Sequence, residues 1–81
     1  MNTIASNLRR ARLVRGLTGR KMAQMLDVNE SQLAKWESGR VTPRAKALAL
    51  YVELGLVSPA QALGLEPVVE PVVEPDEDAA A

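Results

Sequence analysis

The sequence contains no cysteine and no histidine, and its aromatic residues are one tryptophan and one tyrosine. Without cysteine the chain can form neither a disulfide nor a zinc site with thiolate ligands. Without histidine it lacks the side chain that most often acts as a metal ligand or as a general base near neutral pH. We therefore expect no bound metal, no cofactor and no enzymatic activity.

Long apolar runs are also absent. A helix that spans a bilayer needs about 20 consecutive apolar residues, and a secretory signal needs a hydrophobic segment near the N-terminus. The pattern predicts a cytoplasmic protein without membrane contact. At 81 residues, the chain has room for one small domain with a thin core.

The formal net charge of zero hides an uneven distribution of charge along the chain. All ten lysine and arginine residues lie between Arg9 and Lys46, and only Asp27, Glu30 and Glu37 oppose them before residue 53. The other seven acidic residues follow, with no basic residue among them. A cationic body of this kind favours a polyanionic partner, although a merely solvated surface would show the same excess.

The apolar spacing predicts short amphipathic helices in the first half of the chain. In residues 3–15 apolar side chains recur every three or four positions, and Gly16 follows as a stop signal. Thr18 can cap a second helix, at about residues 18–26, and Asn29 can cap a third, at about residues 30–38. Gly39 can end the third helix in the left-handed conformation.

Two threonine or serine residues that precede proline predict the later helices. Thr42 followed by Pro43 predicts a fourth helix that runs to Gly55, with proline in its first turn. Ser58 followed by Pro59 predicts a fifth, short helix. No alternating pattern typical of strands precedes residue 66, so we expect an all-α domain of four to five helices.

After Leu65 the composition changes to the repeat "EPVVEPVVEP" followed by "DEDAAA". Proline at every fourth position excludes a regular helix. We therefore divide the chain into a helical domain, residues 1–65, and an acidic tail, residues 66–81, which we expect to be extended or disordered. Flexible carboxylates of this kind cannot hold a catalytic acid and base at a fixed distance, which further argues against an enzyme.

The second and third helices, joined by a short turn and followed by a polar helical face, predict a helix-turn-helix. The stretch "NLRRARLVRGLTGRKMAQMLDVNESQLAKWESGRVTPRAKALALYVELG" also resembles the phage repressor and Cro-like helix-turn-helix family of the xenobiotic-response-element type. The marks of the resemblance are Arg12 before "GLT", Met22-Ala23, the "WESG" that closes the third helix, and Pro43. The resemblance implies a lambda-repressor-like DNA-binding fold.

On this interpretation the third helix has a buried face and an exposed face. Leu33 and Trp36, spaced three residues apart, are expected to pack inward. The resemblance implies that Glu37 forms an ion pair with Arg12 and so ties the third helix to the first.

The exposed face carries the candidate base contacts, which are Glu30, Ser31, Gln32 and Lys35. Gln32 has the donors and acceptors for adenine, Lys35 can donate to guanine, and Glu30 can accept from cytosine. The resemblance matches Glu30, Ser31 and Lys35 to base-contacting positions, and Gln32 to a more variable one. Glu30 would be repelled by phosphates unless a cation such as Arg20 compensates its charge.

The candidate phosphate contacts surround this face and are Arg20, Lys21, Asn29, Arg40 and Arg44. One residue departs from the family pattern. Gly19 stands where the family usually has a glutamine that binds a phosphate and braces the third helix. Its absence predicts a weaker start to the second helix and leaves the details of docking open.

Six apolar residues in or near the last two predicted helices exceed what a small core needs. They are Leu50, Leu54, Leu56, Val57, Leu63 and Leu65. We expect a symmetric homodimer formed through about residues 51–65, and therefore a palindromic operator. The alternative is that these side chains close the core of the monomer.

The sequence thus predicts a DNA-binding transcriptional regulator, a small homodimeric repressor of phage or mobile-element type that acts at the nucleoid. The main alternative is an antitoxin-like adaptor that binds its operator through the helical body and a protein partner through the acidic tail. A further possibility is that the tail occupies the cationic surface as a mimic of phosphate.

Overall fold

The chain folds into five helices in a computed structural model that describes residues 3–68. They are α1 (Thr3–Leu13), α2 (Gly19–Leu26), α3 (Glu30–Glu37), α4 (Ala45–Glu53) and α5 (Pro59–Ala62). The expected all-α fold of four to five helices is confirmed. Among the described residues, no helix combines the length and the apolar character needed to cross a membrane. The predicted tail from residue 69 onward lies outside the described residues.

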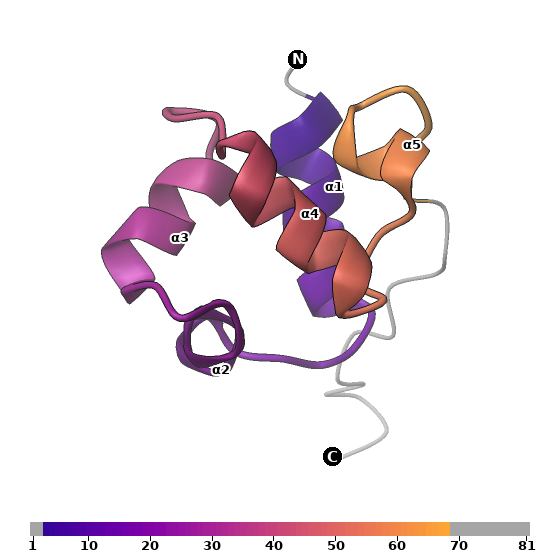
Figure 1. The fold of residues 1–81 in the computed structure, drawn as a ribbon. Helices are drawn as coiled ribbons and strands as arrows, with labels where there is room; N and C mark the ends of the chain where they lie inside the picture. Colours follow the sequence, from indigo (N-terminus) through magenta and orange to yellow (C-terminus); the bar gives the residue numbers. More distant parts are fainter. Residues whose placement is uncertain (1–2, 69–81) are drawn as a thin grey trace, which may run out of the picture.

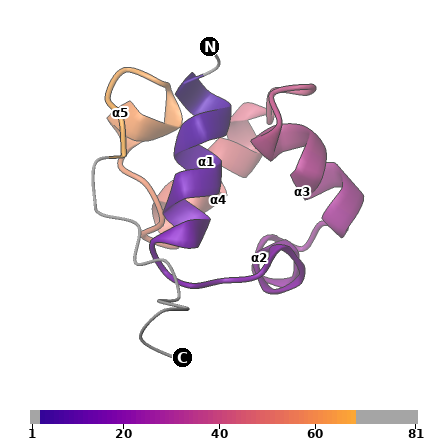
Figure 2. The ribbon, with the colours of Figure 1, turned by 180° about the vertical axis from the view of Figure 1, so that it is seen from behind.

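The helices enclose one small apolar core. In Figures 1 and 2, α1 and α4 lie on opposite sides of the core, α2 and α3 close one end, and α5 covers the other. The largest fully buried side chains are Leu8, Met22, Leu33 and Tyr51. Each comes from a different helix, so the core joins α1, α2, α3 and α4 into one unit.

Side-chain caps begin three of the helices where the sequence predicts them. Thr18 accepts a hydrogen bond from the Lys21 amide at the start of α2, and Asn29 accepts one from the Gln32 amide at the start of α3. Ser58 and Gln61 form a reciprocal capping box at α5. These caps satisfy amides that have no partner within their own helix.

The turn between α2 and α3 is made by a residue other than glycine. Asp27 has a φ of 57°, and its amide ends α2 by donating to the last carbonyls of that helix. Aspartate enters the left-handed region more readily than most residues, since its short polar side chain can bond locally. The predicted helix-turn-helix therefore closes through Asp27 without a glycine.

The predicted start of the fourth helix was wrong. Thr42 does not cap it: α4 begins at Ala45, its N-cap is Arg44, and the Arg44 side chain makes no capping bond. Pro43 instead lies buried in the extended approach to the helix. The fixed φ of proline fits an extended segment as well as a first helical turn. Here Pro43 lies before the helix, and its ring is buried there.

Two of the six apolar residues assigned to a dimer surface belong to the monomer core. Leu56 and Val57 are buried, and Leu50 packs against the core from its edge. Leu54, Leu63 and Leu65 remain exposed, at 42%, 62% and 75%. Part of the apolar excess is therefore explained by the monomer.

Beyond Leu65, hydrogen bonds with Asn7 attach residues 66–68 to the domain. Asn7, 2% exposed, donates from Nδ2 to the carbonyl oxygens of Gln61 and Glu66, at 2.9 and 2.8 Å. Its Oδ1 accepts from the Val68 amide at 2.9 Å, and Val68 is buried. Residues 66–68, which the sequence pattern assigns to the tail, are thus attached to α1.

Replacing Asn7 by alanine should lower the free energy of unfolding by about 2 to 3 kcal/mol, because the Gln61 and Glu66 carbonyl oxygens and the buried Val68 amide each lose a hydrogen bond. Urea denaturation followed by Trp36 fluorescence measures this loss. Ser6→Ala, at an exposed position of the same helix, is the control and should have little effect. Hydrogen exchange at the Val68 amide should also accelerate in Asn7→Ala, and unchanged protection there would contradict the role of Asn7.

Candidate nucleic-acid interface

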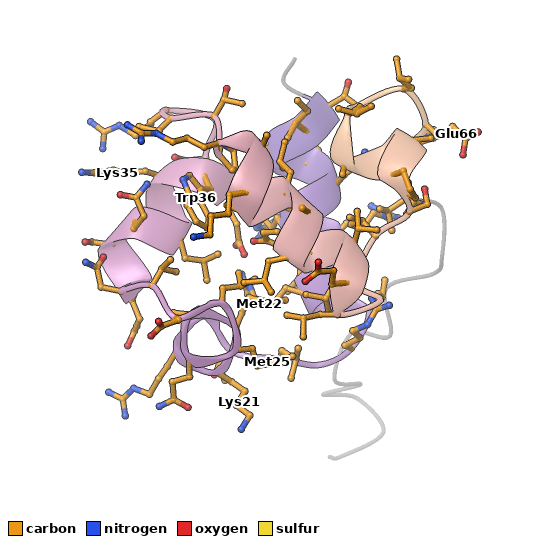
Figure 3. All side chains as sticks on the ribbon, in the orientation of Figure 1. Lys21, Met22, Met25, Lys35, Trp36 and Glu66 are labelled. Carbon is orange, nitrogen blue, oxygen red and sulfur yellow. The ribbon has the colours of Figure 1, made fainter. Side chains whose placement is uncertain are left out.

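The third helix is attached to the domain along one side and exposed along the other. Leu33 and Trp36 are both buried and face the core as expected. Figure 3 shows Lys35 on the outer side of the same helix, directed away from the domain. The inner side of α3 is therefore packed against the core, and its outer side is a polar surface exposed to solvent.

Arg12 and Glu37 form an ion pair that joins α1 to α3. The guanidinium donates from Nη2 to Glu37 Oε1 and from Nε to Oε2, both at 2.9 Å. The two side chains are only 16% and 9% exposed. Arg12 also donates from Nη1 to the Leu17 carbonyl oxygen at 3.0 Å, so one guanidinium holds α3 and the segment that leads into α2.

The hydrogen bond to Glu37 raises the pKa of Arg12, against the opposing effect of burial. The guanidinium therefore stays charged, and the pair acts as a permanent link. Breaking one half of a largely buried pair leaves the other charge without a partner, which costs more than the intact pair contributes.

Glu37→Ala should lower the free energy of unfolding by about 3 kcal/mol, and Arg12→Ala by at least as much. The chain contains its own matched control. Arg20 and Glu30 also form an ion pair, at 3.3 Å, but their side chains are 78% and 58% exposed. Alanine at either of these two positions should cost less than about 1 kcal/mol. Equal losses for the two pairs in thermal or urea unfolding would contradict the assignment.

Tyr51 is fully buried, close enough to Arg12 and Glu37 for both charges to act on its hydroxyl. Its hydroxyl has no hydrogen-bond partner among residues 3–68. Burial raises the pKa of Tyr51 above its ordinary value, and the Glu37 carboxylate raises it further, while Arg12 opposes the shift. The buried Tyr51 hydroxyl therefore stays protonated and uncharged.

Tyr51→Phe should leave the free energy of unfolding unchanged or raise it by about 1 kcal/mol, because it removes a buried polar group that lacks a partner. The raised pKa adds a signature at high pH. The unfolded chain ionises Tyr51 near its ordinary pKa of about 10, so the stability of the native protein falls as pH rises above that value. This part of the decline should be missing in Tyr51→Phe. Identical pH profiles would contradict the raised pKa of Tyr51, and a clear loss of stability at pH 7 would show that the hydroxyl has a partner.

The four candidate base contacts all lie on α3. Glu30, Ser31 and Gln32 form its first turn, and Lys35 lies one turn later on its outer side. Glu30, Ser31 and Lys35 are exposed, and Gln32 is partly exposed. The Ser31 hydroxyl donates to Asn29 Oδ1 at 2.8 Å, and the same oxygen accepts from the Gln32 amide. Asn29 therefore caps the first turn of the helix and orients the Ser31 side chain.

Phosphates would repel the Glu30 carboxylate unless a cation compensates its charge, and Arg20 is in position to do so. Arg20 Nε lies 3.3 Å from Glu30 Oε1, across the turn between α2 and α3. This contact brings Arg20 next to the exposed face of α3. Gly19, one residue earlier, has open space where a Cβ would lie, so packing does not require glycine there.

Cations surround the exposed face of α3. Six are exposed on α2, on α3, between α3 and α4, and in the first turn of α4: Arg20, Lys21, Lys35, Arg40, Arg44 and Lys46. Of the acidic residues between 19 and 46, only Asp27 and Glu30 are exposed. In Figure 3 Lys21 and Lys35 project from neighbouring helices on this side, whereas Glu66 lies at the far side of the domain.

A groove that the sequence did not predict adjoins this surface. It has a volume of about 680 Å³ and lies between the turn after α2, the end of α3 and the first half of α4. Its apolar lining comes from Leu26, Val28, Trp36, Val41, Ala47 and Leu50. Arg44, Lys46 and Asp27 are its charged residues, and Gln32 and Thr42 are its neutral polar ones. Lys46 was missed because a single lysine within a predicted helix carries no signal of its own.

No group of three or more histidine, cysteine, aspartate or glutamate side chains in the described part of the chain could bind a metal ion.

The family model described as a helix-turn-helix domain matches residues 4–66, which cover α2 to α5 in full and α1 from its second residue. No curated protein and no solved structure shows a significant match to the chain.

Proposed function

Since the chain belongs to the helix-turn-helix domain family, we propose that it is a sequence-specific DNA-binding transcriptional regulator in which α3 enters the major groove. The observation that carries the proposal is the two-sided character of α3. Its inner side is held by Leu33, Trp36 and the Glu37 ion pair, and its outer side is polar and surrounded by exposed cations. A rigid helix with a free polar face is what reading of base edges requires.

The base contacts of the proposal follow from the chemistry of the exposed side chains. Gln32 can bond adenine through two atoms, and Lys35 can donate to guanine O6 and N7. Glu30 can accept from the amino group of cytosine while Arg20 balances its charge. Ser31 retains acceptor capacity, although its proton is directed at Asn29. Because these preferences differ, the surface favours particular sequences.

The phosphate contacts come from the surroundings of the helix. Arg20, Lys21, Arg40 and Arg44 are exposed and can bind backbone oxygens, and the Asn29 amide nitrogen can donate alongside them. Arg44 does so from the N-cap of α4, whose first amides have no side-chain cap. Phosphate can therefore bind both the guanidinium and the end of the helix.

We further propose that the protein acts as a homodimeric repressor of phage or mobile-element type at the nucleoid. The exposed Leu54, Leu63 and Leu65 support an interface at the end of α4 and at α5, away from α3. Two copies joined there would read half-sites about 34 to 36 Å apart on a palindromic operator. The antitoxin alternative depends on the tail beyond residue 68, and no described residue favours it.

A selection of bound oligonucleotides from a random pool tests the proposal with the full chain. It should return one preferred half-site, present twice in inverted orientation at the spacing of one helical turn. Alanine at Gln32 or Lys35 should then weaken binding to the selected site by about 5- to 150-fold and relax the preference at one base pair, since each such contact contributes about 1 to 3 kcal/mol.

Arg40→Ala should instead weaken binding to all sequences alike and lower the salt dependence by about one contact. Arg9→Ala, at an exposed position on α1 outside the proposed interface, is the matched control and should change binding little. A selection that enriches no sequence, or one whose product is bound equally well by the α3 variants, would overturn the proposal.

A further inference from the structure

The groove beside α3 combines an apolar lining with a cationic rim. Trp36 and Leu50 are among its apolar residues, and Arg44 and Lys46 are its two cations, against the single carboxylate of Asp27. A ligand that fits such a groove carries apolar side chains and negative charge together. The groove also shares Arg44 with the proposed phosphate contacts, so whatever binds there competes with DNA.

The chain contains a segment of this composition. Residues 69–81, outside the described part, read "VEPVVEPDEDAAA" and contain five carboxylates, three valines and no cation. Residues 3–68 contain all ten cations and five carboxylates, so a domain of charge +5 is joined to a segment of charge −5. The attraction between them acts over about a Debye length, roughly 8 Å at physiological salt.

The segment starts from a fixed point and has the length to reach the groove. Val68 is buried and its amide is bound to Asn7, so the residues that follow begin at the surface of α1. Residues 74–78 lie six to ten residues beyond Val68 and so can reach about 19 to 31 Å from it when the chain is extended. A domain of this size is about 28 Å across. The covalent link raises the local concentration of the segment to the millimolar range, so a weak contact is enough to populate the bound form.

We propose that residues 74–78 of this segment, "EPDED", bind the cationic rim of the groove formed by Arg44 and Lys46 in the DNA-free protein. The carboxylates take the place of backbone phosphates, and DNA must displace them. The contact itself is independent of the proposed function, whereas the competition with DNA rests on it.

The absence of cysteine makes the contact directly measurable in the full chain. Ala79→Cys introduces a single thiol, to which a nitroxide spin label can be attached. In the DNA-free protein at low salt, the label should broaden the NMR signals of the amide protons within residues 41–46, where only Pro43 has none. High salt should relieve the effect. Arg44→Gln combined with Lys46→Gln should abolish this broadening.

The matched control replaces two cations outside the groove. Arg9→Gln combined with Arg10→Gln removes the same charge from exposed positions on α1, and the broadening at residues 41–46 should persist. Broadening confined to residues next to Val68, or equal loss in both double variants, would overturn the contact. A mixture of spin-labelled protein with unlabelled ¹⁵N-protein tests for exchange between molecules. Broadening of residues 41–46 in the unlabelled molecules of this mixture, at the strength that intermolecular exchange predicts, would assign the groove to the segment of a second copy and would also overturn the proposal.

The competition is measured with the site selected from the random pool. Replacing the five carboxylates by amides (E70Q, E74Q, D76N, E77Q and D78N) should tighten DNA binding at low salt by about tenfold if the segment covers the rim nine-tenths of the time. A general charge effect is separated by repeating the replacement in the Arg44→Gln, Lys46→Gln background, where the gain should be smaller.

An equal gain in the two backgrounds would overturn the competition. If no form of the protein binds DNA, the proposed function fails, while the spin-label experiment still decides the contact.

Discussion

The orientation of α3 depends on the guanidinium of Arg12. It bonds both carboxylate oxygens of Glu37 and the Leu17 carbonyl oxygen, so three segments meet at one planar group. A rigid, permanently charged fork with several donors suits this position, because lysine could offer only a point charge. Leu33 and Trp36 are buried and turn one side of α3 toward the core. The ion pair adds a second attachment at the end of the helix, and the two together hold the opposite side outward.

The same arrangement separates the energetic roles of neighbouring residues. Trp36 and Glu37 stabilise the domain, while Lys35 and Gln32, on the same eight-residue helix, contribute little to folding and are available for a ligand. Changes on the outer side can therefore alter recognition without loss of the fold. Asn29 connects the two roles, because its side-chain oxygen caps α3 and also orients Ser31. Arg20 connects them on the side of α2, where it neutralises Glu30 at a contact that is too exposed to stabilise the fold appreciably.

Local signals in the sequence were sufficient for most of the fold, and they failed where a distant contact decided the structure. The caps at Thr18, Asn29 and Ser58 could be read because a cap and its amide lie three residues apart. Pro43 could not, because its burial depends on what packs over it. Asn7 also escaped notice, although it stands on the same helical face as Ile4 and Ala11, where a polar residue signals a buried hydrogen-bond network. Its partners lie more than 50 residues away. The composition of α3 indicated the candidate site, but the groove beside it is formed by three segments that only the fold brings together.

The distribution of charge has a consequence for how such a protein would respond to salt. The affinity of a cationic protein for DNA falls with salt because counterions are released from the phosphates it neutralises. Five carboxylates lie beyond residue 68, and they equal the net positive charge of the described domain. Under the proposed contact these carboxylates compete with DNA for the domain, and salt weakens that attraction as well. The two effects oppose each other, so the proposal implies an affinity for DNA that falls less steeply with salt than the number of phosphate contacts suggests. Under the same proposal, a DNA site that adds base contacts to phosphate contacts displaces the segment most readily.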